Sequence, residues 1–84
     1  MNTSEIAVGA RVRSLFPLSG VPKGTEGVID KLYESGFMVA WDLPDQPLPP
    51  GYRQDDGRPA IATGLLRDGF DTEKELYLLE VVKP

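Results

Sequence analysis

Short stretches with a two-residue alternation of polar and apolar side chains run through this chain and predict a small all-β protein. Residues 11–14 alternate in this way, as expected for a half-buried strand. Residues 28–33 and 37–41 are separated by a three-residue turn, which is the arrangement of a β-hairpin. Two further strands are expected over 65–70 and 78–82. About five strands of this length predict one small antiparallel barrel with the hairpin at its centre.

The phase of these strands predicts the core. Phe37, Val39 and Trp41 share one face of the second hairpin strand, and we assign that face to the interior. The predicted core consists of Val12, Val28 or Ile29, Val39, Trp41, Leu66, Phe70, Leu79 and Val81. On the opposite phase, Met38 and Ala40 would lie beside Val28 and Leu32 and form a second apolar face. A homodimer through the hairpin would bury that face.

The segment 43–64 departs from the strand pattern. It is longer than the roughly 12–15 residues beyond which an unstructured loop in a compact domain is unusual. It contains eight proline and glycine residues, from Pro44 to Gly64, and shows no strand periodicity. Its P-x-x-P spacing favours the polyproline II conformation that aromatic grooves recognise. We therefore expect this insertion to bind a protein partner through Pro47, Pro49, Pro50, Tyr52 and Arg53.

A structural role for the same segment is the competing interpretation. In that case the insertion packs over an open edge of the barrel, with Leu48 and Ile61 as anchors and Tyr52 half-buried. Its prolines would then serve to restrict the unfolded chain. The sequence alone does not decide between a binding role and a structural role for the insertion.

Two short segments outside the predicted strands also carry a structural signal. Residues 1–7 are polar and unpatterned, so they predict a disordered tail before a single barrel domain over 8–84. Asp71 is followed by acidic residues and predicts the N-cap of a short helix or 3-10 turn over 71–76.

Charge argues against nucleic acid as the partner. The chain has nine basic and thirteen acidic side chains, a net charge of -4, which repels phosphate backbones over the surface as a whole. The alternative is a nucleic-acid-binding barrel, whose contact face would be Arg11, Arg13, Lys31 and Tyr33. We expect these residues to be a solvated strand face instead.

The residue types of the chain do not favour a catalytic site or a metal site. There is no histidine or cysteine, and no serine has an evident base beside it. Asp42, Asp45, Asp55 and Asp56 could suggest a hard-cation site, but Asp55 and Asp56 precede Gly57 in an ordinary turn composition. The expectation is a non-enzymatic protein without cofactor or metal, and a small-molecule-binding or catalytic oligomer is the second alternative.

The location of the protein is predicted from two absences in the sequence. A chain without cysteine fits a reducing cytoplasm. The first residues carry no basic segment followed by an apolar one, and no stretch approaches the roughly 20 apolar residues of a membrane span. We expect a cytoplasmic protein with no membrane contact.

Four sequence patterns resemble those of the small bacterial SH3-like barrel domains. They are G-x-R-V over 9–12, P-x-G-T-x-G over 22–27 followed by Val28 and Ile29, V-x-W-D over 39–42, and L-E-x-V over 79–82. The resemblance implies an SH3-like barrel interrupted by the insertion. It implies no particular activity, because this barrel hosts unrelated functions. Together with the charge and the residue types, it favours a non-enzymatic binding or accessory module that contacts a protein partner.

Overall fold

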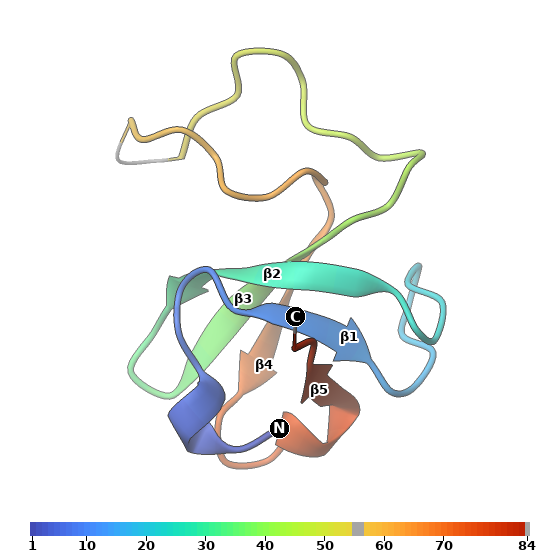
Figure 1. Cartoon of the computed structure of the whole chain (residues 1–84), viewed down its shortest axis with the longest axis vertical. Coiled ribbons are helices and arrows are strands. Elements are labelled where there is room, and N and C mark those ends of the chain that lie inside the picture. Colours follow the sequence, from blue (N-terminus) through green and yellow to red (C-terminus); the bar gives the residue numbers. More distant parts are fainter. Residues whose placement is uncertain (55–56, 84) are drawn as a thin grey trace.

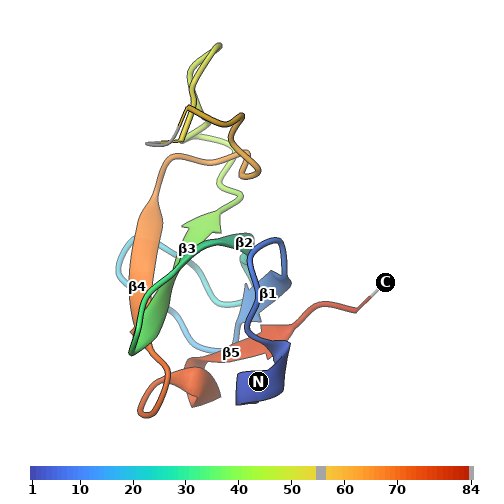
Figure 2. The ribbon, with the colours of Figure 1, turned by 90° about the vertical axis from the view of Figure 1, so that its left-hand side faces the viewer.

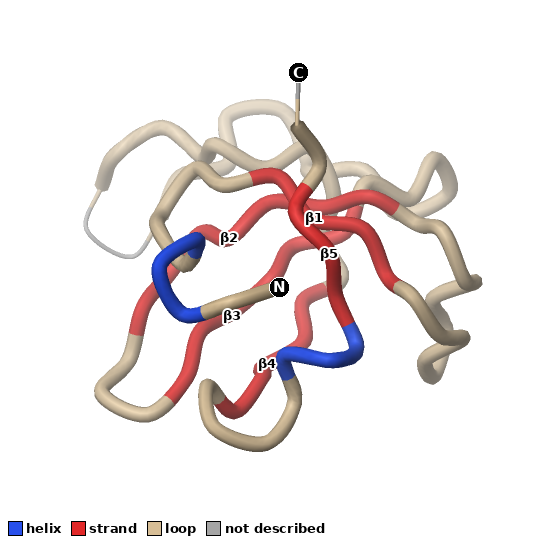
Figure 3. The backbone as a smooth tube through the Cα atoms, turned by 60° about the horizontal axis from the view of Figure 1, so that its bottom comes forward, coloured by secondary structure: helices blue, strands red, loops and turns tan. Residues whose placement is uncertain are grey.

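Five antiparallel strands form one curled sheet in the computed structural model, which describes residues 1–54 and 57–83 (Figure 1). The strands are β1 (Arg11–Ser14), β2 (Glu26–Leu32), β3 (Gly36–Trp41), β4 (Arg67–Asp71) and β5 (Leu79–Val81). They are ordered β4-β3-β2-β1-β5, and the sheet curls around its own concave face (Figure 3). The predicted fold class is confirmed: the protein is all-β, with a half-barrel consistent with a small SH3-like fold.

The hairpin of β2 and β3 lies at the centre of the sheet and supplies most of the core. Ile29 pairs with Val39, and both side chains are fully buried on the concave face. Trp41 is also fully buried, and its ring packs edge-on against Phe70 at a centroid distance of 6.2 Å. Its indole Nε1 donates a hydrogen bond to the Asp68 carboxylate (2.7 Å). The phase predicted for β3 is therefore confirmed, and Ile29 rather than Val28 is the residue that belongs to the core. Leu32, predicted on the outer face, instead pairs with Phe37 because the register shifts between Ile29 and Lys31.

The predicted core needs three corrections. Leu66 and Val81 are only half-buried: Leu66 precedes the edge strand β4, and Val81 is the last residue of the edge strand β5. Val21 is 1% exposed and belongs to the core, although the sequence placed it in an unpatterned connecting loop. Its backbone is paired with Leu18 through two hydrogen bonds (2.8 and 2.9 Å), which turn the side chain inward. A local turn, invisible to strand periodicity, thus contributes a core residue.

The second apolar face predicted for the hairpin is buried in part. Val28 and Ala40 pair with each other on the convex face, yet they are 3% and 0% exposed. Met38 is half-buried. Leu32, the fourth residue of the predicted face, is 46% exposed and pairs with Phe37 beyond the register shift in β2. Two of the four residues on which the homodimer was predicted, Val28 and Ala40, are therefore not available to bury. A dimer itself stays a prediction that a solution mass measurement would test.

The first residues differ from the disordered tail that the sequence predicts. They form a 3-10 turn, η1 (Thr3–Glu5), closed by a capping box in which Asn2 and Glu5 exchange side-chain and backbone hydrogen bonds. Met1 and Ile6 pack against the core, and the Met1 amine donates a hydrogen bond to the Leu79 carbonyl (3.1 Å). This segment lies along the free edge of β5, so its apolar side chains have a surface to cover.

A second 3-10 turn, η2 (Leu76–Leu78), leads into β5. Asp71 has the capping role that the sequence gave it, since its carboxylate accepts hydrogen bonds from the backbone of Glu73 (2.8 Å) and Lys74 (3.0 Å). The turn that Asp71 caps precedes η2 rather than belonging to it. Both 3-10 turns lie at one end of the barrel (Figure 1).

The insertion projects from the opposite end of the molecule (Figures 1 and 2). Its two legs run side by side, with hydrogen bonds from Leu48 N to the Thr63 carbonyl (3.0 Å) and from Leu65 N to the Gln46 carbonyl (2.8 Å). Nearer the tip, Gln54 N donates to the Arg58 carbonyl (2.9 Å). The segment is thus an irregular hairpin, whose backbone groups are paired within the insertion instead of with the sheet.

Candidate functional site

A pocket of about 300 Å³ lies between the insertion and the barrel, and we call it the insertion pocket. The barrel side consists of the end of β2, one residue of β4 and the segment before β1. The insertion closes the other side with residues from both of its legs. The lining residues are Val8, Asp30, Lys31, Leu32, Leu48, Tyr52, Gln54, Arg58, Ala60, Ile61, Ala62, Gly64 and Arg67.

A bulge in β2 places two charged side chains on the barrel side of this pocket. The register shifts between Ile29 and Lys31, so that β2 has one residue more than β3 and Lys31 pairs with Met38. Because directly paired residues share a face, the shift brings Lys31 to the convex face, where Asp30 already lies. Asp30 accepts a hydrogen bond and ion pair from Arg67 of β4 (2.9 Å). That contact raises the pKa of the Arg67 guanidinium above its usual value, so the side chain stays charged.

Exposed apolar side chains gather around the insertion pocket. Val8, Leu32, Tyr52 and Ile61 are each between 42% and 55% exposed, and all four line it. Isolated exposed apolar residues are ordinary on protein surfaces, whereas a contiguous group rimmed by polar residues marks an interaction site. These side chains come from three separate parts of the chain, so the group exists only in the folded protein.

The structure divides the contact residues predicted for the insertion. Tyr52 lines the pocket, whereas Arg53 points elsewhere and donates a hydrogen bond to the Gly57 carbonyl (3.2 Å). Pro47, Pro49 and Pro50 are exposed and lie outside the lining. Pro47 instead forms a bridge with Gly64, where the two legs of the insertion meet. The prolines therefore shape the insertion that carries the pocket, and the anchors of the competing structural interpretation, Leu48 and Ile61, are the residues that line it.

Sequence reasoning missed the contribution of the barrel to this site. The sequence pattern predicted only strand positions for Val8 and Leu32, and it predicted Arg67 as a solvent-facing polar residue of a strand. Arg58 lies in a stretch without periodicity. The pairing of β2 with β3 and the path of the insertion bring these residues together, and neither can be read from spacing along the chain.

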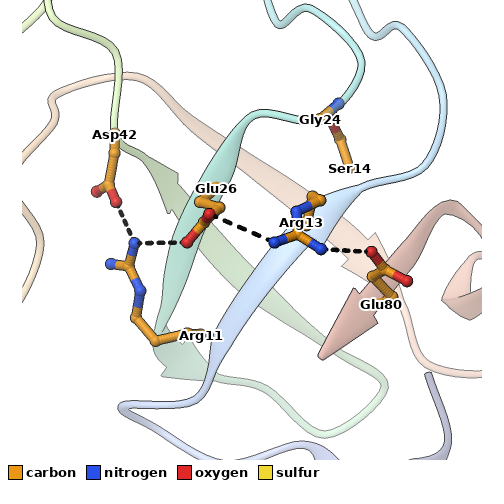
Figure 4. Close-up of polar contacts among 7 residues, drawn as sticks. All are labelled: Arg11, Arg13, Ser14, Gly24, Glu26, Asp42 and Glu80. Carbon is orange, nitrogen blue, oxygen red and sulfur yellow. Dashed lines mark hydrogen bonds and ion pairs between the residues drawn. The ribbon is translucent and has the colours of Figure 1, made fainter. Parts of the chain in front are cut away.

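A row of alternating charges occupies another part of the convex face (Figure 4). Arg11 contacts Glu26 (3.5 Å) and Asp42, and Arg13 contacts Glu26 (3.5 Å) and Glu80 (2.8 Å). The hydrogen bond to Asp42 raises the pKa of Arg11, and the hydrogen bond to Glu80 raises the pKa of Arg13. Each arginine thus faces carboxylates rather than an open surface.

This row separates the residues of the alternative nucleic-acid face. Arg11 and Arg13 belong to the row, whereas Lys31 lines the insertion pocket and lies over the Tyr33 ring at 5.4 Å. Phosphate binding requires clustered cations whose charge is not already compensated. The geometry of these four residues gives no such cluster.

We expect the protein to leave a labelled single-stranded RNA or DNA unshifted in a mobility assay at about 150 mM salt, where phosphate contacts weaken strongly. The reason is the pairing of Arg11 and Arg13 with acidic side chains. Arg11→Glu and Arg13→Glu should give the same null result as the parent. A shift by the parent that is lost in these variants would contradict this expectation and restore the nucleic-acid alternative.

The polar side chains of Ser14 and Asp42 have structural roles. The buried Ser14 hydroxyl donates to the Pro22 carbonyl (3.1 Å) and accepts from the Gly24 amide (3.1 Å), which fixes the turn before β2. Asp42 is engaged by Arg11 and by the Thr63 hydroxyl (2.7 Å), so it joins the base of the insertion to the charged row. Asp55 and Asp56 lie outside the described residues.

Comparison of this chain with protein-family models, with curated proteins and with solved structures gave no match. None of the helical segments in the described part of the chain has the length and apolar character needed to cross a membrane.

Proposed function

We propose that this protein is a non-enzymatic binding module and that the insertion pocket is where it contacts a protein partner. The observation that carries the proposal is the gathering of Val8, Leu32, Tyr52 and Ile61 around one concavity. Burying such half-exposed side chains contributes about 25 cal/mol for each Å² of apolar surface removed from water. The SH3-like resemblance supports a module of this kind without naming its partner.

The size of the pocket indicates what part of a partner it takes. Ligand pockets range from roughly 300 to 1,000 Å³, and this one lies at the lower limit. A short extended segment with a few side chains fits such a volume, whereas the body of a folded domain does not. The hydrogen bonds between the legs of the insertion hold one wall in place, which reduces the ordering cost of binding. A cysteine-free chain is consistent with a partner in the cytoplasm, and we include that location in the proposal.

Selection from a random dodecapeptide library displayed on phage tests this function. The full chain is expected to enrich a set of peptides, and Tyr52→Ala should weaken the binding of the best one by about tenfold, as expected for an aromatic anchor. Tyr77→Ala is the matched control, because Tyr77 is 65% exposed and lies outside the pocket. Peptide binding should remain within about twofold of the parent in that variant.

A second pair of variants separates the pocket from the insertion as a whole. Ile61 belongs to the returning leg of the insertion and Leu65 directly follows that leg; they are 44% and 48% exposed, but of the two only Ile61 lines the pocket. Ile61→Ser should reduce peptide binding and Leu65→Ser should leave it unchanged. Failure to enrich any peptide, or equal losses in both members of each pair, would overturn the proposed function.

A further inference from the structure

The sheet has two edge strands, and the described part of the chain covers one of them. Residues 1–6 lie along β5, where the Met1 amine donates a hydrogen bond to the Leu79 carbonyl (3.1 Å). β4 lies at the other end of the strand order and pairs with β3 alone (Figure 3). Its five consecutive pairs with β3 show no register shift, so no bulge turns this edge away from a neighbouring strand.

The hydrogen bonds to β3 fix which backbone groups of β4 point outward. The Trp41 amide donates to the carbonyl of the residue directly before β4 (2.9 Å). Because residues that face the neighbouring strand alternate with residues that face away, Asp68 and Phe70 also exchange hydrogen bonds with β3. The N–H and C=O groups of Arg67 and Gly69 therefore point away from the sheet.

The turn after β4 occupies only the last of the outward-facing residues. The Asp71 amide donates to the Glu75 carboxylate (2.8 Å), and the Asp71 carbonyl accepts from the Glu75 amide (3.1 Å). Arg67 and Gly69 are both exposed, and no residue in the described part of the chain bonds to their backbone. Two donors and two acceptors thus remain along about 7 Å of strand edge. An extended chain segment has backbone groups at the same spacing and can pair with all four.

Charged side chains often protect an exposed strand edge, but those of β4 are held elsewhere. Arg67 is paired with Asp30 of β2 at 2.9 Å. The Asp68 carboxylate accepts the hydrogen bond of the Trp41 indole, and the Asp71 carboxylate caps the following turn. The outward backbone groups at the middle of the edge belong to a glycine, which has no side chain to obstruct a neighbour.

A second copy of β4 does not fit this edge. The symmetric antiparallel pairing that uses all four groups joins Arg67 of each copy to Gly69 of the other. It also places the two Asp68 residues directly opposite each other, and like charges in that position destabilise a strand pair. A segment with a different sequence avoids this repulsion.

We propose that β4 accepts an extended segment of the protein partner as a further antiparallel strand, and that this segment also supplies the side chain that enters the insertion pocket. Arg67 connects the two sites, because its outward backbone groups lie on the edge and its side chain lines the pocket. Directly opposed residues share a face, so the partner residue opposite Arg67 projects on the face from which Arg67 reaches the pocket.

In such an added strand, backbone hydrogen bonds contribute affinity and the pocket selects the side chain. An acidic residue opposite Asp68 is disfavoured for the reason that excludes the second copy. The inference rests on the proposed function, because it assigns the backbone of the segment whose side chain the insertion pocket takes.

Methylation of single backbone nitrogens in the best library peptide tests the added strand without altering the protein. A methyl group removes one N–H donor and obstructs a neighbouring strand. The amides of the two peptide residues opposite Arg67 and Gly69 point toward β4, and the amide of the residue between them points to water. Binding should weaken about tenfold at each of the two positions and stay within about twofold of the unmodified peptide at the position between them.

Hydrogen exchange of the full chain, followed at single amides by NMR, locates the edge itself. In the free protein, the Arg67 and Gly69 amides should exchange fast. Saturation with the same peptide should slow both at least about tenfold, because each gains an acceptor. Asp68 and Phe70 are the matched controls: their amides are bonded to β3 and should exchange slowly with and without the peptide.

The outcomes distinguish this inference from the function on which it rests. A peptide that requires Tyr52 but shows no two-residue alternation, and leaves the Gly69 amide unprotected, would overturn the inference and leave the binding function intact. Protection of Gly69 that rises with protein concentration without peptide would assign the edge to a second copy and overturn the inference as well. A peptide that protects Gly69 but binds Tyr52→Ala as tightly as the parent would overturn the proposed function and the joint use of both sites. If no peptide is enriched, both fall.

Discussion

Replacement of Trp41 by alanine is expected to lower the free energy of unfolding by about 3–5 kcal/mol, the usual cost of removing a large aromatic side chain from a core. Trp41 is fully buried, and it is the largest side chain of the concave face. Its ring packs on Phe70, and its Nε1 is bonded to the Asp68 carboxylate at 2.7 Å. The change therefore opens a cavity at the middle of the half-barrel and leaves a carboxylate without its donor.

The effect approaches the whole stability of the domain, because the free energy of unfolding of native proteins is only about 5–15 kcal/mol. Circular dichroism during urea unfolding measures it directly. Trp41→Phe is the informative control: it retains most of the ring packing and loses the bond to Asp68, so a smaller loss is expected. A Trp41→Ala protein with the same urea midpoint as the parent would contradict the core described here.

Replacement of Gly64 by alanine is expected to destabilise the protein by about 2–3 kcal/mol, toward the upper part of the range for overpacking. A Cβ atom at this position would lie 1.7 Å from the Trp41 carbonyl oxygen and 2.9 Å from the carbonyl carbon. Both are backbone atoms, so no side-chain rotation can relieve the contact. The returning leg of the insertion would have to move away from the end of β3.

This second substitution also affects the insertion pocket, because Gly64 lines it and forms the bridge with Pro47 that joins the two legs. Peptide binding should decrease together with the urea midpoint. Gly69→Ala is the control within the sheet, since its Cβ would meet only the flexible Met38 side chain, at 3.3 Å. Unchanged stability and unchanged peptide binding in Gly64→Ala would show that the insertion does not pack against β3 in this way.

Strand periodicity determined the central part of this fold. The alternation in the hairpin assigned Phe37, Val39 and Trp41 to one face, and all three are buried there. The reason is that side chains of a strand point to opposite faces in turn, so one buried face leaves a direct record in the sequence. The capping aspartate Asp71 and the five strands themselves were likewise predictable from local chemistry.

The same periodicity could not identify residues that are buried for other reasons. Val21 enters the core through a tight turn, and Val28 and Ala40 are buried although they lie on the face opposite the predicted core. Burial there depends on segments distant in the sequence, which a local pattern does not register. The segment 1–7 is a comparable case, since its short 3-10 turn depends on packing against the edge of β5.

The sequence by itself determined that the insertion is unusually long and rich in proline, and it predicted Tyr52 as a contact residue. Only the tertiary structure decided that the pocket also contains Val8, Leu32 and Arg67 from the barrel. The physical reason is the bulge in β2 together with the folding back of the insertion. The first redirects Lys31 to the convex face, and the second brings Arg58 and Ile61 over it. Neither depends on residues close to each other along the chain, so the site is a property of the folded arrangement alone.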